Sequence, residues 1–220
     1  MIESIHGNSV EESLLKAYAD ERERLLALAQ MDEPQGEYGF PVFGEGNTAA
    51  RTILIGEAPG AEETKQNRPF VGKAGKQLDE LILIFGVHRS ELFITNVVKY
   101  RPVIRSAKTI RNRTPVPAEV KASLPLLKRE IELIRPSVLL TLGNTPLKAV
   151  CQMFHVPAPA IGEAHGKELT LRVSDESVIR FIPLYHPASG IYNRSLIEIM
   201  EQDAEFAGEV LRGNGCHCTE

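Results

Sequence analysis

Four side chains with different chemistry stand at or just beyond the ends of apolar, β-type runs of the sequence. They are a carboxylate, an aromatic ring, an amide and an imidazole, and they belong to Glu57, Phe70, Asn96 and His186. Because ligands bind at the carboxyl ends of the strands in an open α/β sheet, we expect the four to surround one pocket. A stacking surface, a hydrogen-bonding amide and two groups able to stabilise charge suit a pocket that grips a planar base and cuts its bond to a sugar.

Each of these residues also has a purely structural interpretation. Asn96 and His186 can do no more than end a strand, and Phe70 can be buried only for packing. Glu57 can pair with a neighbouring arginine. The functional interpretation is favoured because the four occur together, each within a distinctive segment; in chain order the segments read ILIGEAPG, RPFVGKAG, FITNVVK and YHPAS.

Composition places the chain among ordinary soluble globular proteins. It has 220 residues, of which 43% are hydrophobic and 25% charged, and this length suffices for one well-buried core. No run of about 18 apolar residues is present to span a membrane, and the N-terminus lacks the features of a secretory signal. Cys151, Cys216 and Cys218 show neither metal spacing nor a disulfide framework. We therefore expect a cytoplasmic protein, and a monomer.

A basic segment follows Asn96 closely. Although the net charge is −4, the stretch from residue 99 to residue 113 holds no acidic side chain and six cationic ones, namely Lys99, Arg101, Arg105, Lys108, Arg111 and Arg113. Local charge matters more than the sum, because attraction to phosphate is screened within about 8 Å at physiological salt. Such a run is also typical of a solvated loop, but its place immediately after Asn96 favours a phosphate-binding role.

Strand and helix patterns alternate along the chain. Strands are expected at 52–56, 92–96 and 137–142, with a β-pair at 167–173 and 178–185. Helices are expected at about 10–30, 74–85, 117–134, from 146 onward and at 193–211. Residues 32–47 and the basic segment are predicted to be irregular loops, and residues 213–220 a flexible tail. This alternation predicts a single α/β domain over residues 1–220 with a mainly parallel sheet.

Five segments together resemble the uracil-DNA glycosylase superfamily, and within it family four, the iron–sulfur type. They read GEAPGAEE, RPFVGKAG, FITNVVKYRP, NRTPVPAEV and YHPAS, and the resemblance runs in order over residues 52–200. It implies a three-layer α/β/α sandwich with a short, mainly parallel central sheet. It also implies a DNA glycosylase that hydrolyses the bond between deoxyribose and uracil, or a related deaminated base, in base excision repair. A catalytically weak or inactive DNA-binding module and a hydrolase of free nucleosides or nucleotides remain as alternatives.

The resemblance also implies a role for each residue of the pocket. His186 would donate a hydrogen bond to O2 of the departing base, Asn96 would read N3–H and O4, and Phe70 would stack on the ring. Glu57 would lie beside C1′, where it either stabilises the positive sugar or orients the attacking water. The backbone of Ala58 would bind the base.

A second set of residues is expected to hold the DNA. The segment after His186 is similar to the family's minor-groove loop, in which Ile191 or Tyr192 would fill the gap left by a flipped base. The expected DNA-binding residues are Lys99, Arg101, Arg113, Ser189 and Arg194.

One departure from the family pattern concerns its cofactor. Family-four enzymes hold an iron–sulfur cluster with cysteine thiolates. This chain has no cysteine before the GEAPG segment, and Tyr100 and Ser123 stand where the remaining two ligands are expected. We therefore predict that the protein holds no cluster and no other metal or cofactor. The basic segment also looks extended relative to the family, around residues 103–110.

Overall fold

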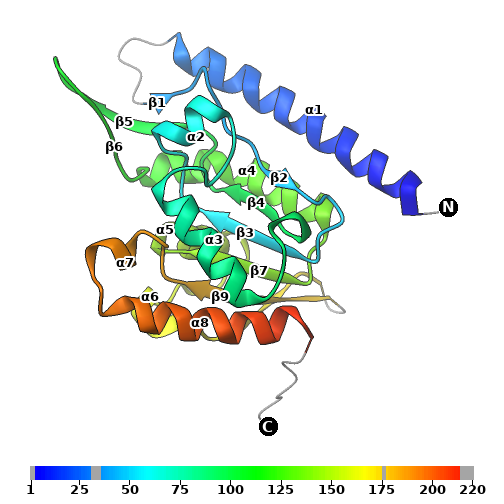
Figure 1. Ribbon diagram of the computed structural model, residues 1–220. Coiled ribbons are helices and arrows are strands. Elements are labelled where there is room, and N and C mark those ends of the chain that lie inside the picture. The colour runs from blue at the N-terminus through cyan, green and yellow to red at the C-terminus, as the bar shows by residue number, and fades with distance from the viewer. Residues whose placement is uncertain (1–2, 31–35, 175–176, 214–220) are drawn as a thin grey trace.

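A mixed sheet of six strands forms the centre of the fold (Figure 1). The computed structural model describes residues 3–30, 36–174 and 177–213, and the side chains among these except those of residues 3–8 and 191–192. The sheet has the order β2-β4-β3-β7-β9-β8. Its four inner strands run parallel: β4 (Phe93–Asn96), β3 (Thr52–Gly56), β7 (Val138–Leu142) and β9 (Val178–Leu184). The two edge strands, β2 (Glu45–Gly46) and β8 (Leu169–Arg172), are antiparallel to their neighbours.

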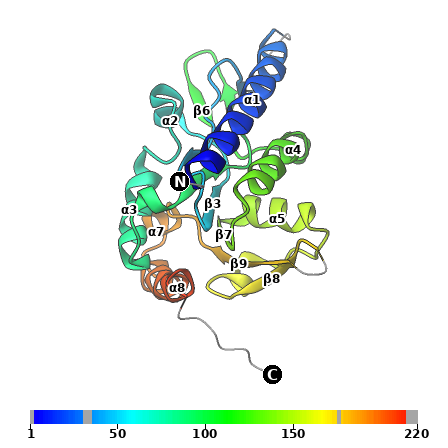
Figure 2. The same ribbon diagram turned by 90° about the vertical axis from the view of Figure 1, so that its right-hand side faces the viewer.

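Helices cover both faces of this sheet (Figure 2). On one face lie α4 (Pro117–Ile134) and α5 (Asn144–Met153), with the long α1 (Glu3–Ala29) packed on α4. On the other face lie α3 (Lys73–Phe85) and α8 (Leu196–Leu211), which pack against each other. Every residue of β3, β4 and β7 is buried, as expected for parallel strands covered on both sides. The predicted three-layer α/β/α sandwich is therefore confirmed.

The predicted strands and main helices are present, with some differences at their ends. α5 begins at Asn144 rather than residue 146, after Gly143 with a φ of +94°. α8 begins at Leu196 rather than residue 193, because the Asn193 side chain accepts hydrogen bonds from the Ser195 backbone and hydroxyl. Four short helical segments were not predicted: α2 (Ala61–Gln66), η1 (Arg89–Glu91), α6 (Ile161–Ala164) and α7 (Ser189–Tyr192).

The N-terminal helix is longer than predicted and only partly buried. Leu14 and Leu25 pack in the core, whereas Leu15 and Leu26 are 61% and 44% exposed. Apart from Gly213, the predicted flexible tail lies outside the described residues, as do Cys216 and Cys218. Within the described part of the chain, no helix has both the length and the apolar character needed to cross a membrane.

The prediction of an irregular basic loop is wrong. The segment forms an antiparallel hairpin of β5 (Arg101–Arg105) and β6 (Ile110–Asn112), and the short β1 (Gly36–Glu37) pairs with β5. The turn between them is closed by a hydrogen bond of 2.9 Å from Ser106 N to Thr109 O. The apolar β-branched residues Val103, Ile104 and Ile110 favour this strand pairing. The cationic residues among them obscured this β-strand pattern in the sequence.

The Lys99 side chain is buried beneath the sheet's carboxyl edge rather than exposed. It is 0% exposed, and its Nζ lies 2.7 Å from Glu130 Oε2 on α4. The same ammonium donates at 2.6 Å to Thr95 Oγ1 and at 2.6 Å to the Asn96 carbonyl, while Tyr18 on α1 donates to Glu130 at 2.8 Å. Burial lowers the pKa of Lys99, and the Glu130 carboxylate opposes that shift. We therefore correct the prediction that Lys99 contacts DNA, because all of its donors are used inside the protein.

Removing one member of this buried pair should destabilise the fold. We expect Lys99→Met to lower the free energy of unfolding by about 3–5 kcal/mol, because it leaves the Glu130 carboxylate buried without its cation. The double variant Lys99→Met/Glu130→Met should recover at least half of that loss. Urea unfolding measures both, and a loss below about 1 kcal/mol in the single variant would contradict the assignment.

Candidate active site

A cavity of about 690 Å³ opens where β3, β4 and β9 end, and all four predicted side chains line it. Glu57 follows β3, Asn96 ends β4 and His186 follows β9, while Phe70 reaches the cavity from the loop before α3. A second cavity of about 760 Å³ lies among α4, α5 and the β8–β9 pair and contains none of the four. We assign the first as the candidate active site, because it gathers the groups that can do chemistry.

Gly56 brings the aromatic ring and the amide together. A side chain at this position would overlap with both the Phe70 ring and Asn96 Oδ1. Phe70 itself has a φ of +54°, a conformation that is rare for a bulky residue and is found mainly at functional sites. Gly75 leaves room for the Phe70 carbonyl, and Arg89 Nη2 donates to the Pro69 carbonyl at 2.8 Å. The strained backbone of Phe70 is thus held in place by its surroundings.

Backbone pairing fixes Asn96 relative to Glu57. Val97 N donates to Gly56 O at 2.9 Å and Val98 N donates to Glu57 O at 3.0 Å, so the β3–β4 ladder continues beyond both strands. The Asn96 side chain is 3% exposed. Within the described residues its amide group has no hydrogen-bond partner, and it is therefore available to a ligand in the cavity.

The Glu57 carboxylate is held by a hydroxyl and not by an arginine. Thr145 Oγ1, in the first turn of α5, donates to Glu57 Oε2 at 2.6 Å. Burial raises the pKa of Glu57, and the Thr145 hydrogen bond partly offsets the rise. Sequence reasoning missed this contact, because 88 positions separate Thr145 from Glu57.

His186 carries a defined hydrogen-bonding state. The Ala188 backbone N–H donates to its Nδ1 at 3.1 Å, which leaves the proton of the neutral ring on Nε2. Burial lowers the pKa of His186 and so favours this neutral form. Gly143 allows the close packing, since a Cβ there would lie 3.2 Å from His186 Cβ.

Glu63 joins two of the segments that form the cavity. Its Oε1 accepts from Gly72 N at 2.7 Å and from Val71 N at 3.1 Å, and its Oε2 accepts from Gly60 N at 3.1 Å. One carboxylate thereby connects the turn after Glu57 to the loop that carries Phe70. Sequence reasoning missed this role, although a glutamate three residues into a helix is the usual position of a capping box.

The expected DNA-binding residues fall into two groups. Arg113 lines the cavity but pairs with Glu119 at 2.6 Å, and Arg101 pairs with Glu37 at 3.2 Å. Ser189 is half-buried at the start of α7, and Arg194 is exposed after it. The side chains of residues 191–192 lie outside the description.

Sequence reasoning missed Lys73, an exposed residue of the cavity wall at the start of α3. It could have been found from its position in the segment RPFVGKAG, three residues after Phe70.

The positions expected for cluster ligands hold a different set of interactions. The Tyr100 ring packs edge-on against Tyr38 at 4.5 Å, and its hydroxyl donates to Glu119 Oε1 at 3.0 Å. Ser123 Oγ donates to the Glu119 carbonyl at 2.9 Å. Across the described residues no group of three His, Cys, Asp or Glu side chains could hold a metal. Since an iron–sulfur cluster needs cysteine thiolates, these residues do not fit one.

Comparison with known proteins adds an independent observation. A family model described as the uracil DNA glycosylase superfamily matches residues 43–208. A type-4 uracil-DNA glycosylase of Saccharolobus solfataricus is 39% identical over 171 residues, which are 77% of this chain and 76% of the relative. That of Sulfurisphaera tokodaii is 40% identical over 163 residues, 74% of this chain and 70% of the relative. That of Archaeoglobus fulgidus is 36% identical over 169 residues, 77% of this chain and 81% of the relative.

Removal of the Glu63 carboxylate should loosen the cavity wall. We expect Glu63→Ala to lower the free energy of unfolding by about 1–3 kcal/mol, because it leaves three backbone N–H groups without their acceptor. Hydrogen exchange of the amides of Gly60, Val71 and Gly72 should also accelerate. Glu62→Ala, which removes an exposed neighbour paired with Lys65, is the matched control. Equal exchange rates in the two variants would refute the clamping role of Glu63.

Proposed function

Because the chain belongs to the uracil DNA glycosylase superfamily, we propose that it hydrolyses the N-glycosidic bond of uracil, or a related deaminated base, in DNA. The observation that carries this proposal is that Glu57, Phe70, Asn96 and His186 line one cavity. The names of its relatives, type-4 uracil-DNA glycosylases, agree with it. We also propose that the protein acts as a single-domain monomer in the cytoplasm.

The base enters the cavity after rotation out of the DNA stack, a step that costs a few kcal/mol. Stacking on Phe70 returns about 1–3 kcal/mol. The Asn96 amide donates to O4 of uracil and accepts from its N3–H, and cytosine presents the opposite pattern of donor and acceptor. Base selection therefore rests on the orientation of one amide, which has no hydrogen-bond partner in the described part of the chain.

The glycosidic bond breaks with its electron pair moving to the base. The departing uracil becomes an anion, and the sugar becomes a positively charged oxocarbenium ion. We assign His186 to the anion, because its neutral ring offers the Nε2 proton for a hydrogen bond to O2. A donor positioned where charge develops contributes strongly to rate.

Glu57 acts on the sugar half of the substrate. One of its oxygens is held by Thr145, which fixes the carboxylate while its negative charge stabilises the oxocarbenium ion or orients the attacking water. Water then forms a bond to C1′, and the proton that it releases neutralises the uracil anion, so the products are neutral uracil and an abasic site. Ala58, next in the chain, lines the same cavity, and we assign its backbone to binding the base.

The proposed contacts with DNA lie at the rim of the cavity. We propose that Arg113, Ser189 and Arg194 bind the backbone around the extruded nucleotide, together with Lys73. Arg101 acts through its contacts with Glu37 and with Asn112, which it reaches at 2.6 Å, to hold the β5–β6 hairpin beside the rim. This mechanism uses no cofactor, in keeping with residues that do not fit an iron–sulfur cluster.

A DNA-binding module that no longer cuts is the second candidate. The observation that favours it is the loss of cysteines at the positions now held by Tyr100 and Ser123. Such a module would bind DNA in a salt-dependent way and release no base.

Excision is the direct test of the two candidates. We expect the purified protein, free of stoichiometric iron, to release uracil from an oligonucleotide that carries one deoxyuridine, so that alkali then cleaves the strand at that site. An iron chelator should leave the rate unchanged. If no cleavage occurs on single- or double-stranded DNA across several deaminated bases while DNA binding persists, the module is the correct assignment.

Substitution of His186 tests the leaving-group role. We expect His186→Ala to slow excision by at least about a hundredfold, because the developing negative charge on the base loses its donor. Affinity for undamaged DNA should stay within about threefold of the parent, since little charge is removed at neutral pH. His88→Ala, at an exposed histidine outside the cavity, is the matched control. An excision rate in His186→Ala equal to that of the control would remove His186 from the mechanism.

A further inference from the structure

The β5–β6 hairpin projects from the body of the protein (Figure 1), and residues at its base line the candidate site. We propose that it is a second DNA contact, which binds the sugar–phosphate backbone of nucleotides flanking the extruded one. The proposal rests on the function proposed above and extends it, because it assigns the protein a need for DNA beyond the target nucleotide. Four properties of the hairpin support it: its unpaired charge, its exposed apolar residues, its firm base and its position.

The charge of the outer hairpin is not neutralised by the protein. Arg105, Lys108 and Arg111 are all exposed, and none has an ion pair or side-chain hydrogen bond among the described residues. No acidic residue occurs between residues 99 and 113. The three cations are thus free to bind phosphates.

Strand register distributes these residues over both faces of the hairpin. Arg105 pairs with Ile110 and Ile104 pairs with Arg111, so each face carries one arginine across from one isoleucine. Ile104 and Ile110 are 59% and 45% exposed. A cation beside an apolar side chain on each face suits contact with phosphate and deoxyribose together.

The base of the hairpin is fixed at the cavity rim. Asn112 and Arg113, at the end of β6, line the cavity. The Arg113–Glu119 and Arg101–Glu37 pairs hold the two strands, and β1 adds further pairing to β5. The hairpin is therefore a supported element and not a free loop.

Geometry sets the reach of the hairpin. From Asn112 back to the turn at Thr109 the strand covers about 10 Å, at roughly 3.4 Å per residue. One strand of DNA also advances by about 3.4 Å per nucleotide, so the tip of the hairpin lies about three nucleotides from the rim of the cavity. The expected contact is with the DNA beside the lesion and not with the lesion itself.

Charged residues on an edge strand also have a purely structural use, because they prevent association between sheet edges. That use requires no DNA and predicts no dependence on substrate length. The two explanations are therefore separable by experiment.

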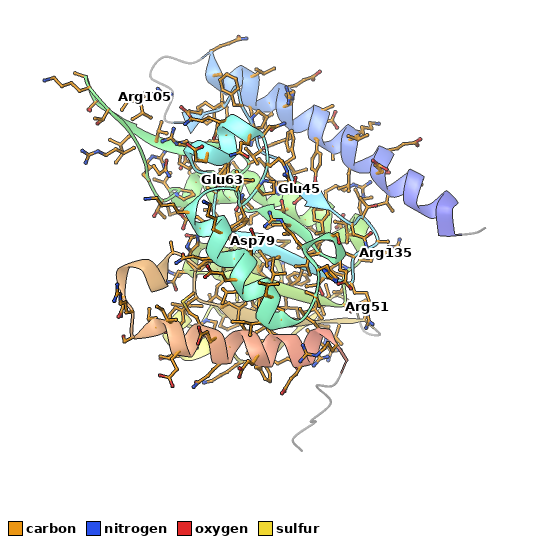
Figure 3. All side chains as sticks on the ribbon, in the orientation of Figure 1. Glu45, Arg51, Glu63, Asp79, Arg105 and Arg135 are labelled. Carbon is orange, nitrogen blue, oxygen red and sulfur yellow. The ribbon has the colours of Figure 1, made fainter. Side chains whose placement is uncertain are left out.

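The test compares two variants that remove the same charge from opposite ends of the molecule. Arg105→Ser/Lys108→Ser/Arg111→Ser alters the hairpin, and Arg51→Ser/Lys128→Ser/Arg172→Ser removes three exposed cations at the opposite end of the sheet. Figure 3 places Arg105 on the projecting hairpin and Arg51 at the far side of the molecule. Two properties are measured: affinity for undamaged DNA as a function of salt, and kcat/KM on uracil oligonucleotides of about 5 and about 21 nucleotides.

We expect the hairpin variant to bind undamaged DNA with a salt slope smaller by about 2–3, since each lost phosphate contact lowers it by about one. The parent and the control should favour the longer oligonucleotide, and the hairpin variant should lose most of that preference. A salt slope and a length preference equal to the control's would overturn the proposal. If the triple variant does not fold, Arg105→Ser and Lys108→Ser are tested singly, each with an expected slope change of about one.

The two proposals fail separately. Binding to undamaged DNA needs no base release, so a reduced slope in a protein that never releases uracil would reject the glycosylase function and keep the hairpin contact. Excision by the hairpin variant with an unchanged length preference would keep the glycosylase function and reject the hairpin contact.

Discussion

The buried ion pair of Lys99 and Glu130 connects the layers of the fold to the candidate site. Through one ammonium it joins α4 to β4, and it also binds the carbonyl of Asn96. Through the carboxylate it receives the hydroxyl of Tyr18, which brings α1 into the same network. The residue assigned to read the base is therefore positioned by a charge pair that no solvent reaches. A site that must discriminate by the direction of one amide benefits from such support, because small displacements weaken hydrogen bonds steeply.

Three glutamates organise the surroundings of the site in the same manner. Glu63 gathers backbone N–H groups from two segments, Glu130 gathers the buried network, and Glu119 accepts from Arg113, Tyr100 and the Val116 backbone. Although burial alone would raise it, the pKa of Glu119 is lowered by these hydrogen bonds. Polar networks that are fully satisfied give rigidity and a unique arrangement. One of the three glutamates, Glu119, also holds Tyr100 and Ser123, the two residues at positions where the family resemblance led us to expect cysteines.

Much of the fold could be predicted because its signals are local. Short apolar runs identify β3 and β7. Gly86 marks the end of α3. The gathering of Glu57 and His186 followed from a general rule about strand ends. Their positions in the structure agree with that expectation, and their roles remain proposals.

The unpredicted features depend on contacts between distant residues. Lys99 looked like one more cation of a basic run, and only the folded chain places it against Glu130, 31 positions away. Thr145 meets Glu57 across 88 positions. The hairpin was hidden for another reason: its strands are so rich in cations that charge, and not alternation, dominated the pattern.

The left-handed backbone of Phe70 carries a cost that the packing of its ring offsets. A bulky residue with a φ of +54° is strained by about 1–3 kcal/mol, yet the side chain is buried in the apolar core, and removal of such a ring typically costs about 3–5 kcal/mol. A glycine there would relax the main chain but would give up both this packing and the surface on which a base rests. Folding and base binding therefore favour the same residue, so the strain can persist without setting stability against activity.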